Sequence, residues 1–201
     1  IYKTLYPFQQ KGVLSLIKML QKYNGAILAD AVGLGKTWSA LAVMKFFQLQ
    51  GREIMLICPK KLQHNWHRYL KHQNSKFEKD HLEYFIRYTD RSDKLFGNDK
   101  PKLIVIDESH HLRNDKSKRY QFLVEEILKQ NEDIKVLMLS ATPINNSLND
   151  IRNQFKLVVQ GDTRGFDESL GIKNLDYTFR SAQKAFNEWR QMTTPQISAF
   201  I

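Results

Sequence analysis

Residues Gly33–Thr37 read Gly-Leu-Gly-Lys-Thr, shortly after the apolar run Ala26–Ala29 and directly before a helical pattern. A strand, a glycine loop, Lys-Thr and a helix form the arrangement that binds nucleotide phosphates. Glycines let the backbone curl so that several N–H groups face one anion, and the helix adds its positive N-terminus. We therefore predict that Lys36 contacts the β- and γ-phosphates of a nucleotide and that the Thr37 hydroxyl binds Mg²⁺.

Asp30 departs from the strict phosphate-loop pattern, which has glycine at that position. The alternative interpretation of the segment is a turn that contains Gly-x-Gly-Lys-Thr without holding a nucleotide. A second chemical signal favours the phosphate loop.

Asp107 and Glu108 follow directly after a third apolar run, Leu103–Ile106. Ligands of open α/β sheets bind at the carboxyl ends of the strands. We predict that Asp107 holds Mg²⁺ through its water shell and that Glu108 polarises the attacking water as a general base. Together with Lys36 they are the candidate catalytic residues. The alternative is an ordinary pair of surface charges.

Ser140-Ala141-Thr142-Pro143 follow the run Val136–Leu139. Small hydroxyl residues next to the acids could relay the state of the γ-phosphate by hydrogen bonding, whereas the alternative is a strand that simply ends in a proline turn. The neighbouring His110 and His111 do not predict zinc, because no cysteine or carboxylate spacing completes four ligands.

The elements that must position these residues can be read from the hydrophobic pattern. The three apolar runs above and Ile54–Cys58, with a weaker one at Tyr84–Ile86, have the length and apolar character of buried parallel strands. Helical periods lie between them. One helical face is formed by Val13, Leu16, Ile17 and Leu20, and another by Trp38, Leu41, Ala42, Phe46 and Leu49. A third, less regular helical segment contains Phe122, Leu123, Glu126, Ile127 and Gln130. The alternation predicts an α/β fold with a mostly parallel central sheet and helices on both faces.

The character of the chain changes near Gln160, where glycines punctuate a polar stretch. After it, Phe179, Ala182, Phe186 and Trp189 recur at helical spacing. We therefore expect one domain over residues 1–158, and over 159–201 a helical extension or the start of a connection to a missing part.

Composition limits the classes of function. The chain has 201 residues, a formal net charge of +10 and a single cysteine, Cys58. An internal disulfide is excluded, and a reducing, cytoplasmic setting fits best. No apolar run approaches the roughly 18–20 residues that span a bilayer, so we expect no membrane. The positive charge favours a polyanionic partner, although a solvated lysine-rich surface is the alternative.

Five segments in this order resemble the first RecA-like lobe of the superfamily 2 helicases, most closely the Swi/Snf-type DNA translocases. They are Leu5–Val13, Asp30–Thr37, Ile57–Pro59 with Asn65-Trp66, Asp107–Asn114, and Ser140–Asn146. The second is similar to Asp-Glu-Met-Gly-Leu-Gly-Lys-Thr, so Asp30 is the residue that this family carries, whereas Ala31 and Val32 depart from it.

The resemblance implies a RecA-like P-loop fold and a set of site residues. Gln9 occupies the glutamine position of the adenine-recognition segment. The implied nucleotide contacts are Gln9, Gly33, Leu34, Gly35, Lys36, Thr37 and Trp38, and the residues implied to couple nucleotide state to movement are His110, Ser140, Ala141 and Thr142. Lys60, Lys61, Asn65 and Asn114 are the implied nucleic-acid contacts, with a solvated first helical turn as the alternative for the two lysines. For Trp66 we expect packing within the core.

The family implies a motor that uses ATP and Mg²⁺ and moves along DNA, duplex DNA in particular, with RNA still open. ATP lies in a cleft between two RecA-like lobes, and arginines of the second lobe complete the site. Because an arginine finger accelerates turnover by orders of magnitude, we expect this chain alone to bind ATP and to hydrolyse it slowly.

Three other functions stay open. The first is the motor subunit of a restriction or phage-defence complex, which uses the same lobe. The second is a nucleotide-gated binding scaffold, which would not need both Lys36 and Glu108. The third is a small-molecule phosphotransferase, which the acid pair and the following Ser-Ala-Thr disfavour.

Overall fold

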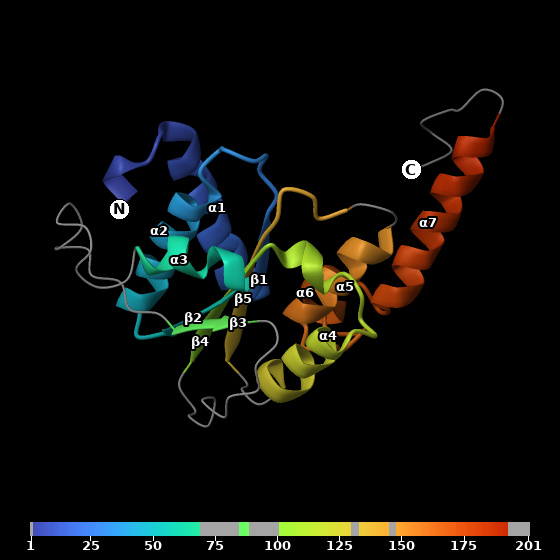
Figure 1. Cartoon of the computed structure of the whole chain (residues 1–201). Coiled ribbons are helices and arrows are strands. Elements are labelled where there is room, and N and C mark those ends of the chain that lie inside the picture. Colours follow the sequence, from blue (N-terminus) through green and yellow to red (C-terminus); the bar gives the residue numbers. More distant parts are fainter. Residues whose placement is uncertain (1, 69–84, 89–100, 130–132, 145–147, 193–201) are drawn as a thin grey trace.

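The computed structural model describes residues 2–68, 85–88, 101–129, 133–144 and 148–192. Its centre is a sheet of five parallel strands in the order β1-β5-β4-β2-β3 (Figure 1). The strands are β1 Gly25–Leu28, β2 Glu53–Cys58, β3 Phe85–Tyr88, β4 Lys102–Asp107 and β5 Ile134–Leu139. Every predicted apolar run overlaps a strand, and the weakest one, 84–86, is shifted toward the N-terminus relative to β3.

Seven α-helices and several short turns connect and cover the described strands. The helices are α1 Pro7–Tyr23, α2 Lys36–Leu49, α3 Gln63–His67, α4 Lys118–Phe122, α5 Leu148–Val158, α6 Asp167–Leu170 and α7 Leu175–Gln191. Turns of 3-10 helix lie at Tyr2–Thr4, Lys60–Leu62 and Ser109–Leu112, and a π-helical turn follows α4 at Leu123–Leu128. In this part of the chain no helix is long and apolar enough to cross a membrane.

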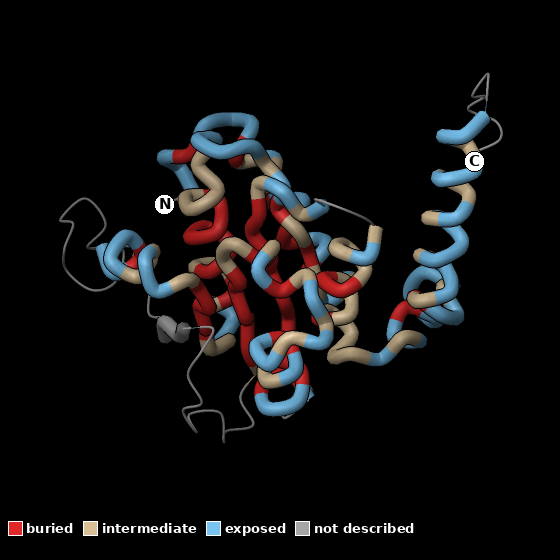
Figure 2. Tube along the Cα trace, turned by 45° about the vertical axis from the view of Figure 1, so that its right-hand side comes forward, coloured by how far each residue is buried: buried red, intermediate tan, exposed pale blue. Residues whose placement is uncertain are grey.

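Alternate side chains of β1, β2, β4 and β5 enter two separate cores. In β2, Ile54 and Leu56 pack in a cluster with α1, α2 and Trp66, whereas Met55 and Ile57 pack in a cluster with α4, the π-helical turn and α5. Successive strand residues point to opposite faces. Both faces of the sheet are therefore covered, which explains why its strands are mostly apolar and confirms the predicted architecture (Figure 2).

The predicted helical faces were right for α1 and only partly right elsewhere. All four predicted residues of α1 are buried. In α2, Leu41 and Ala42 are buried, but Leu49 is 75% exposed and Met44 and Phe47 are fully buried instead. The middle of α2 contacts α1 as well as β2 and β4, so more than one stripe of it is covered.

The third predicted segment is less regular than the other two, as expected, and its Glu126 is exposed. The segment is helical, but the π-helical turn buries Leu123, Val124, Ile127 and Leu128. A π-helix has a wider turn than an α-helix, so the spacing of core residues differs from a period of 3.6. Gln130 lies outside the described residues.

Helix α7 forms the expected helical extension and runs beside α5 (Figure 1). Leu175, at its first turn, is its one buried residue, and most of the rest is exposed (Figure 2). Lys156 of α5 pairs with Asp176 of α7, with 2.9 Å between Nζ and Oδ1. Arg152 lies 3.5 Å from the same carboxylate, so two cations hold the start of α7 against α5. The domain boundary after residue 158 stays a prediction.

Candidate nucleotide-binding site

The three motif segments leave the sheet at one edge and side by side. Leu139, the last residue of β5, is paired with Leu28 of β1 on one side and with Asp107 of β4 on the other. The phosphate loop follows β1, the acid pair closes β4, and Ser140 follows β5. Parallel strands end at a common edge, so this register brings together the residues that the sequence separates by more than one hundred positions.

The glycines of the phosphate loop have the backbone conformation that the loop requires. Gly33 and Gly35 have φ angles of +88° and +77°, in the region that L-residues rarely adopt. Gly35 also caps α2, and a Cβ atom there would lie 2.5 Å from Nε2 of Gln9. The Asp30-initiated segment therefore curls into the first turn of α2 as predicted.

Gln9 is buried and braces this loop. Its Nε2 donates to the carbonyl of Leu34 at 3.0 Å, and its Oε1 accepts from the backbone N–H of Tyr6 at 3.0 Å. The structure thus joins the adenine-recognition segment to the phosphate loop. Contact between Gln9 and a base stays a prediction.

Lys36 folds back onto its own loop. Its Nζ donates to the carbonyls of Asp30 at 2.7 Å and of Ala31 at 3.1 Å. The ammonium is therefore at the loop and bonded to acceptors that a phosphate would replace. Thr37 follows it in the first turn of α2, and Trp38 packs partly buried against the core.

Asp107 is held by two hydrogen bonds, one to each oxygen. The indole Nε1 of Trp66 donates to Oδ2 at 2.8 Å, and the backbone N–H of Glu108 donates to Oδ1 at 2.9 Å. Burial raises the pKa of Asp107, while these two bonds and the positive charge of Lys36 oppose the rise. Trp66 is 2% exposed, so the predicted packing role is right, but its bond to Asp107 was not foreseen.

Glu108 adopts a left-handed backbone conformation, with φ 53° and ψ 47°. For a residue other than glycine this conformation is costly and persists only where the surroundings enforce it. Its Oε2 lies 2.9 Å from Nδ1 of His110, and the ring of His110 lies 4.3 Å from that of His111. Within the described ranges, no group of three or more His, Cys, Asp or Glu side chains is arranged to hold a metal ion.

Ser140 ties the third segment to the strand that leads into the phosphate loop. It is buried, its backbone N–H donates to the carbonyl of Leu28 at 3.2 Å, and its hydroxyl accepts from the N–H of Thr142 at 3.1 Å. Ala141 is partly buried and Thr142 is exposed. Their coupling role stays a prediction.

Helix α5 supplies two residues that sequence reasoning missed. Gln154 accepts a hydrogen bond from the hydroxyl of Ser109 at 2.8 Å, and Asn153 donates to the carbonyl of Arg113 at 2.6 Å. The sequence feature that could have indicated them is that Asn153 and Gln154 lie within one helical turn of the apolar Ile151 and Leu157. Both are buried.

The candidate nucleic-acid contacts lie in two places. Lys60, Lys61 and Asn65 are exposed on the 3-10 turn and on α3, beyond the carboxyl end of β2. Asn114 is exposed too, but its Oδ1 accepts from the N–H of Lys116 at 3.0 Å and so shapes its own turn.

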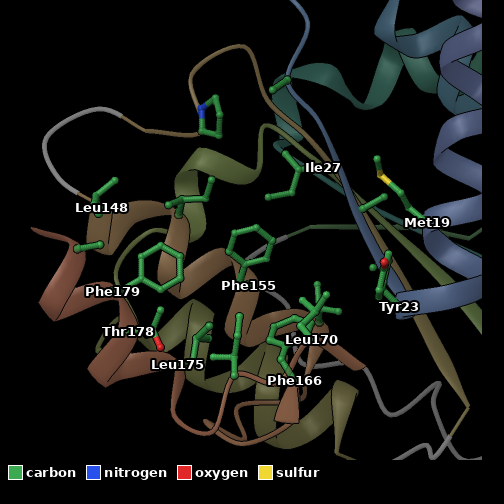
Figure 3. A pocket seen from close by; sticks show the side chains of 18 residues that line it. Met19, Tyr23, Ile27, Leu148, Phe155, Phe166, Leu170, Leu175, Thr178 and Phe179 are labelled. Carbon is green, nitrogen blue, oxygen red and sulfur yellow. The ribbon is translucent and has the colours of Figure 1, made fainter. Parts of the chain in front are cut away.

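A separate apolar cavity of about 580 Å³ lies between β1, the end of α1 and helices α5–α7 (Figure 3). Figure 3 shows Phe155, Phe166 and Phe179 entering it from these helices. None of its 18 lining residues is charged, so it offers nothing to phosphates and is distinct from the nucleotide site.

Comparisons with known proteins agree with this geometry. The sequence model of the family described as "Type III restriction enzyme, res subunit" matches residues 2–145. The ATP-dependent helicase YqhH of Bacillus subtilis is 31% identical over 160 residues, which are 72% of this chain and 28% of that protein. A SWI/SNF-related chromatin regulator homolog of Caenorhabditis elegans, containing DEAD/H box 1, is 29% identical over 175 residues, covering 72% of this chain and 17% of that protein.

The SWI2/SNF2 ATPase core of Sulfolobus solfataricus, solved in complex with dsDNA, has the same fold. Its TM-score is 0.61 at 23% identity, over 82% of this chain and 38% of that chain. The predicted RecA-like fold and the resemblance to SWI/SNF-type helicases are confirmed. The chain spans less than a third of the length of the Bacillus subtilis helicase and of the Caenorhabditis elegans regulator homolog.

Proposed function

We propose that this chain is the ATP-binding lobe of a DNA-dependent motor. The chain belongs to the Type III restriction enzyme res subunit family, and the proposal starts from that membership. The observation that carries the proposal is the register at Leu139, which sets the phosphate loop and the acid pair at the same sheet edge, on either side of the end of β5. ATP-dependent helicases among the relatives support the use of ATP.

The chemistry follows from the residues at that edge. Lys36 exchanges the carbonyls of Asp30 and Ala31 for the β- and γ-phosphates, and the glycine loop donates its N–H groups to the same anion. The hydroxyl of Thr37 and the carboxylate of Asp107 are oxygen ligands of the kind that Mg²⁺ prefers, and Asp107 is already fixed in orientation by Trp66. Bound Mg²⁺ would neutralise charge between the phosphates.

Glu108 is the proposed general base. Its backbone is strained directly after the fixed Asp107, and Nδ1 of His110 lies 2.9 Å from its carboxylate. A water held by Glu108 would attack the γ-phosphorus while Glu108 accepts a proton of that water. The bond between the γ-phosphorus and the oxygen that bridges it to the β-phosphate would break, and ADP and phosphate would leave. The bond from the backbone N–H of Ser140 to Leu28, at the end of the strand before the phosphate loop, supports the proposed role of Ser140 in sensing the γ-phosphate.

Duplex DNA is the proposed track. The Sulfolobus ATPase core was solved with dsDNA, and several relatives bear SWI/SNF names. Lys60, Lys61 and Asn65 form an exposed basic and polar surface beyond the carboxyl end of β2. Such a surface neutralises phosphates without reading sequence. We also propose that arginines of a second lobe complete the ATP site. The proposed setting is cytoplasmic.

A titration of Mg²⁺-ATP into the chain, measured by calorimetry, tests the site. We expect binding by the natural sequence, at least tenfold weaker binding by Lys36→Ala, and unchanged binding by Lys18→Ala, a control on the exposed face of α1. Equal binding by both variants would refute the phosphate loop as the site.

The family description also favours a second candidate, the motor subunit of a restriction complex. That function uses the same lobe chemistry and differs in the associated nuclease. A binding scaffold without turnover is distinguished by single-turnover hydrolysis: we expect slow release of phosphate by the natural chain and about tenfold less by Glu108→Gln. Equal rates in the two would favour the scaffold.

A further inference from the structure

We infer that Gln154 is a positioning residue that joins the segment of the general base to the segment of the γ-phosphate relay. The inference rests on the proposed function, because it assigns to Gln154 the task of holding Glu108 in register with residues 140–143. Neither Gln154 nor its helix belongs to the motif segments.

The side-chain amide of Gln154 bridges two loops. Its Oε1 accepts from the hydroxyl of Ser109 at 2.8 Å, and its Nε2 donates to the carbonyl of Pro143 at 2.7 Å. Ser109 directly follows Glu108, and Pro143 directly follows Thr142. One side chain therefore contacts the segments of both β4 and β5 just beyond the sheet edge.

The bonding of this amide admits a single orientation. Nε2 has two partners, the carbonyls of Pro143 and of Asp150 at 3.1 Å, and a carbonyl oxygen can only accept. A flipped amide would set its oxygen against both acceptors. The amide thus uses both N–H groups and its oxygen. Gln154 and Ser109 have no exposed surface, so water does not replace these bonds.

The hydrogen bonds of Gln154 stabilise the segment that contains the strained residue Glu108. Glu108 keeps its left-handed conformation between Asp107, fixed by Trp66, and Ser109, fixed by Gln154. Asn153, the neighbour of Gln154, holds the far end of the same turn through the carbonyl of Arg113. Loss of the Gln154 bonds releases the C-terminal side of Glu108 and separates it from the relay segment.

Nucleotide affinity and turnover should therefore respond differently. Gln154 does not touch the phosphate loop, so its loss leaves the contacts of Lys36 and Gln9 in place. The general base, however, would lose its fixed position, and displacement of a catalytic group by about 1 Å lowers the rate by up to about a hundredfold. A residue that merely stabilised the fold would lower affinity and turnover together, in proportion to the folded fraction.

The test uses this chain with Gln154→Leu, Gln154→Met, Ser109→Ala and the double variant Ser109→Ala/Gln154→Leu. The matched control is Gln121→Leu on the exposed side of α4. Calorimetry gives the Kd for Mg²⁺-ATP, single-turnover hydrolysis gives the rate, and circular dichroism confirms folding. We expect Kd to change less than about threefold and the rate to fall about tenfold or more in each Gln154 variant.

The double variant decides whether the effect passes through Ser109. If Gln154 acts on Glu108 through that hydroxyl, the double variant is no slower than the slower single variant. The inference would be overturned if the rate losses of the two single variants multiplied in the double variant. It would also be overturned if the Gln154 variants kept the natural rate, or if they lost rate and affinity equally. If Gln154→Leu does not fold, Gln154→Met and the smaller change Ser109→Ala decide. Absence of ATP binding by the natural chain would instead overturn the proposed function.

Discussion

At the scale of the single residue, Asp107 shows how a site residue destabilises the fold that holds it. Burial raises its pKa above the ordinary value of 3.8, against the opposing effects of Trp66, the N–H of Glu108 and Lys36. The folded state therefore holds this proton more tightly than the unfolded state. The free energy of unfolding then falls as pH rises from 3.8 through the raised pKa, and at neutral pH the charged carboxylate costs stability.

Asp107→Asn should reverse this cost and remove the function. The amide oxygen can still accept from the indole of Trp66, but the amide N–H group cannot accept from the N–H of Glu108, so one of the two hydrogen bonds is lost, as it is when Asp107 is protonated. We expect the nucleotide-free variant to have a higher Tm at pH 7, with little difference at pH 3, and to bind Mg²⁺-ATP at least about tenfold more weakly than the natural chain. Thermal unfolding by circular dichroism at both pH values measures the first effect. A lower Tm at pH 7 would show that the charged carboxylate stabilises the fold.

At the scale of the element, the fit of α5 against β1 depends on the absence of one side chain. A Cβ atom at Gly25 would lie 2.3 Å from both methyl groups of Val158, the last residue of α5. Val158 is β-branched and cannot turn both methyl groups away. Gly25→Ala should therefore push α5 outward and lower the free energy of unfolding by about 1–3 kcal/mol.

Urea unfolding of Gly25→Ala measures that loss, and a second substitution identifies its cause. Val158→Ala in the Gly25→Ala background should restore part of the stability, so that the two changes together cost less than their sum. Gly12→Ala is the matched control, because nothing lies within 4 Å of a Cβ there, inside α1. We expect it to stabilise the chain by about 0.5–1 kcal/mol. Strictly additive losses would argue against the steric explanation.

The elements also show which features a single sequence can predict. The phosphate loop and the strand ends were predictable because each depends on residues within about ten positions of one another. The bond from Trp66 to Asp107 spans 41 positions and that from Ser109 to Gln154 spans 45. Such pairs depend on which strands are neighbours, and neither composition nor periodicity indicates that. The face of α2 was mispredicted for the same reason, since two different partners cover it.

At the scale of the whole molecule, the net charge of +10 predicts salt-dependent binding of duplex DNA. Each phosphate contact contributes about −0.9 to the slope of log K against log salt. Lys60→Ala/Lys61→Ala should therefore make the slope shallower by about 2, with a similar loss for every DNA sequence. Fluorescence anisotropy between about 25 and 200 mM salt measures the slope.

The control for this prediction removes equal charge elsewhere. Lys173→Ala/Lys184→Ala also lowers the net charge by two, at exposed positions before and within α7, away from α3 in Figure 1. We expect a smaller change of slope. If both double variants change the slope equally, binding follows the overall charge and the surface at Lys60 and Lys61 is not the track.

The position of α5 has a consequence for where this lobe can be divided. The stretch shared with the restriction-enzyme family ends at residue 145 and carries every motif segment except for Asn146, the last residue of the last segment, yet α5 begins only at Leu148. A fragment cut at the family limit would keep all the residues that do chemistry. It would leave the hydroxyl of Ser109 and the carbonyl of Arg113 without their partners and would uncover the core beside Leu157. We therefore expect the smallest autonomous unit to extend at least through Val158, so that sequence similarity and independent folding end at different residues.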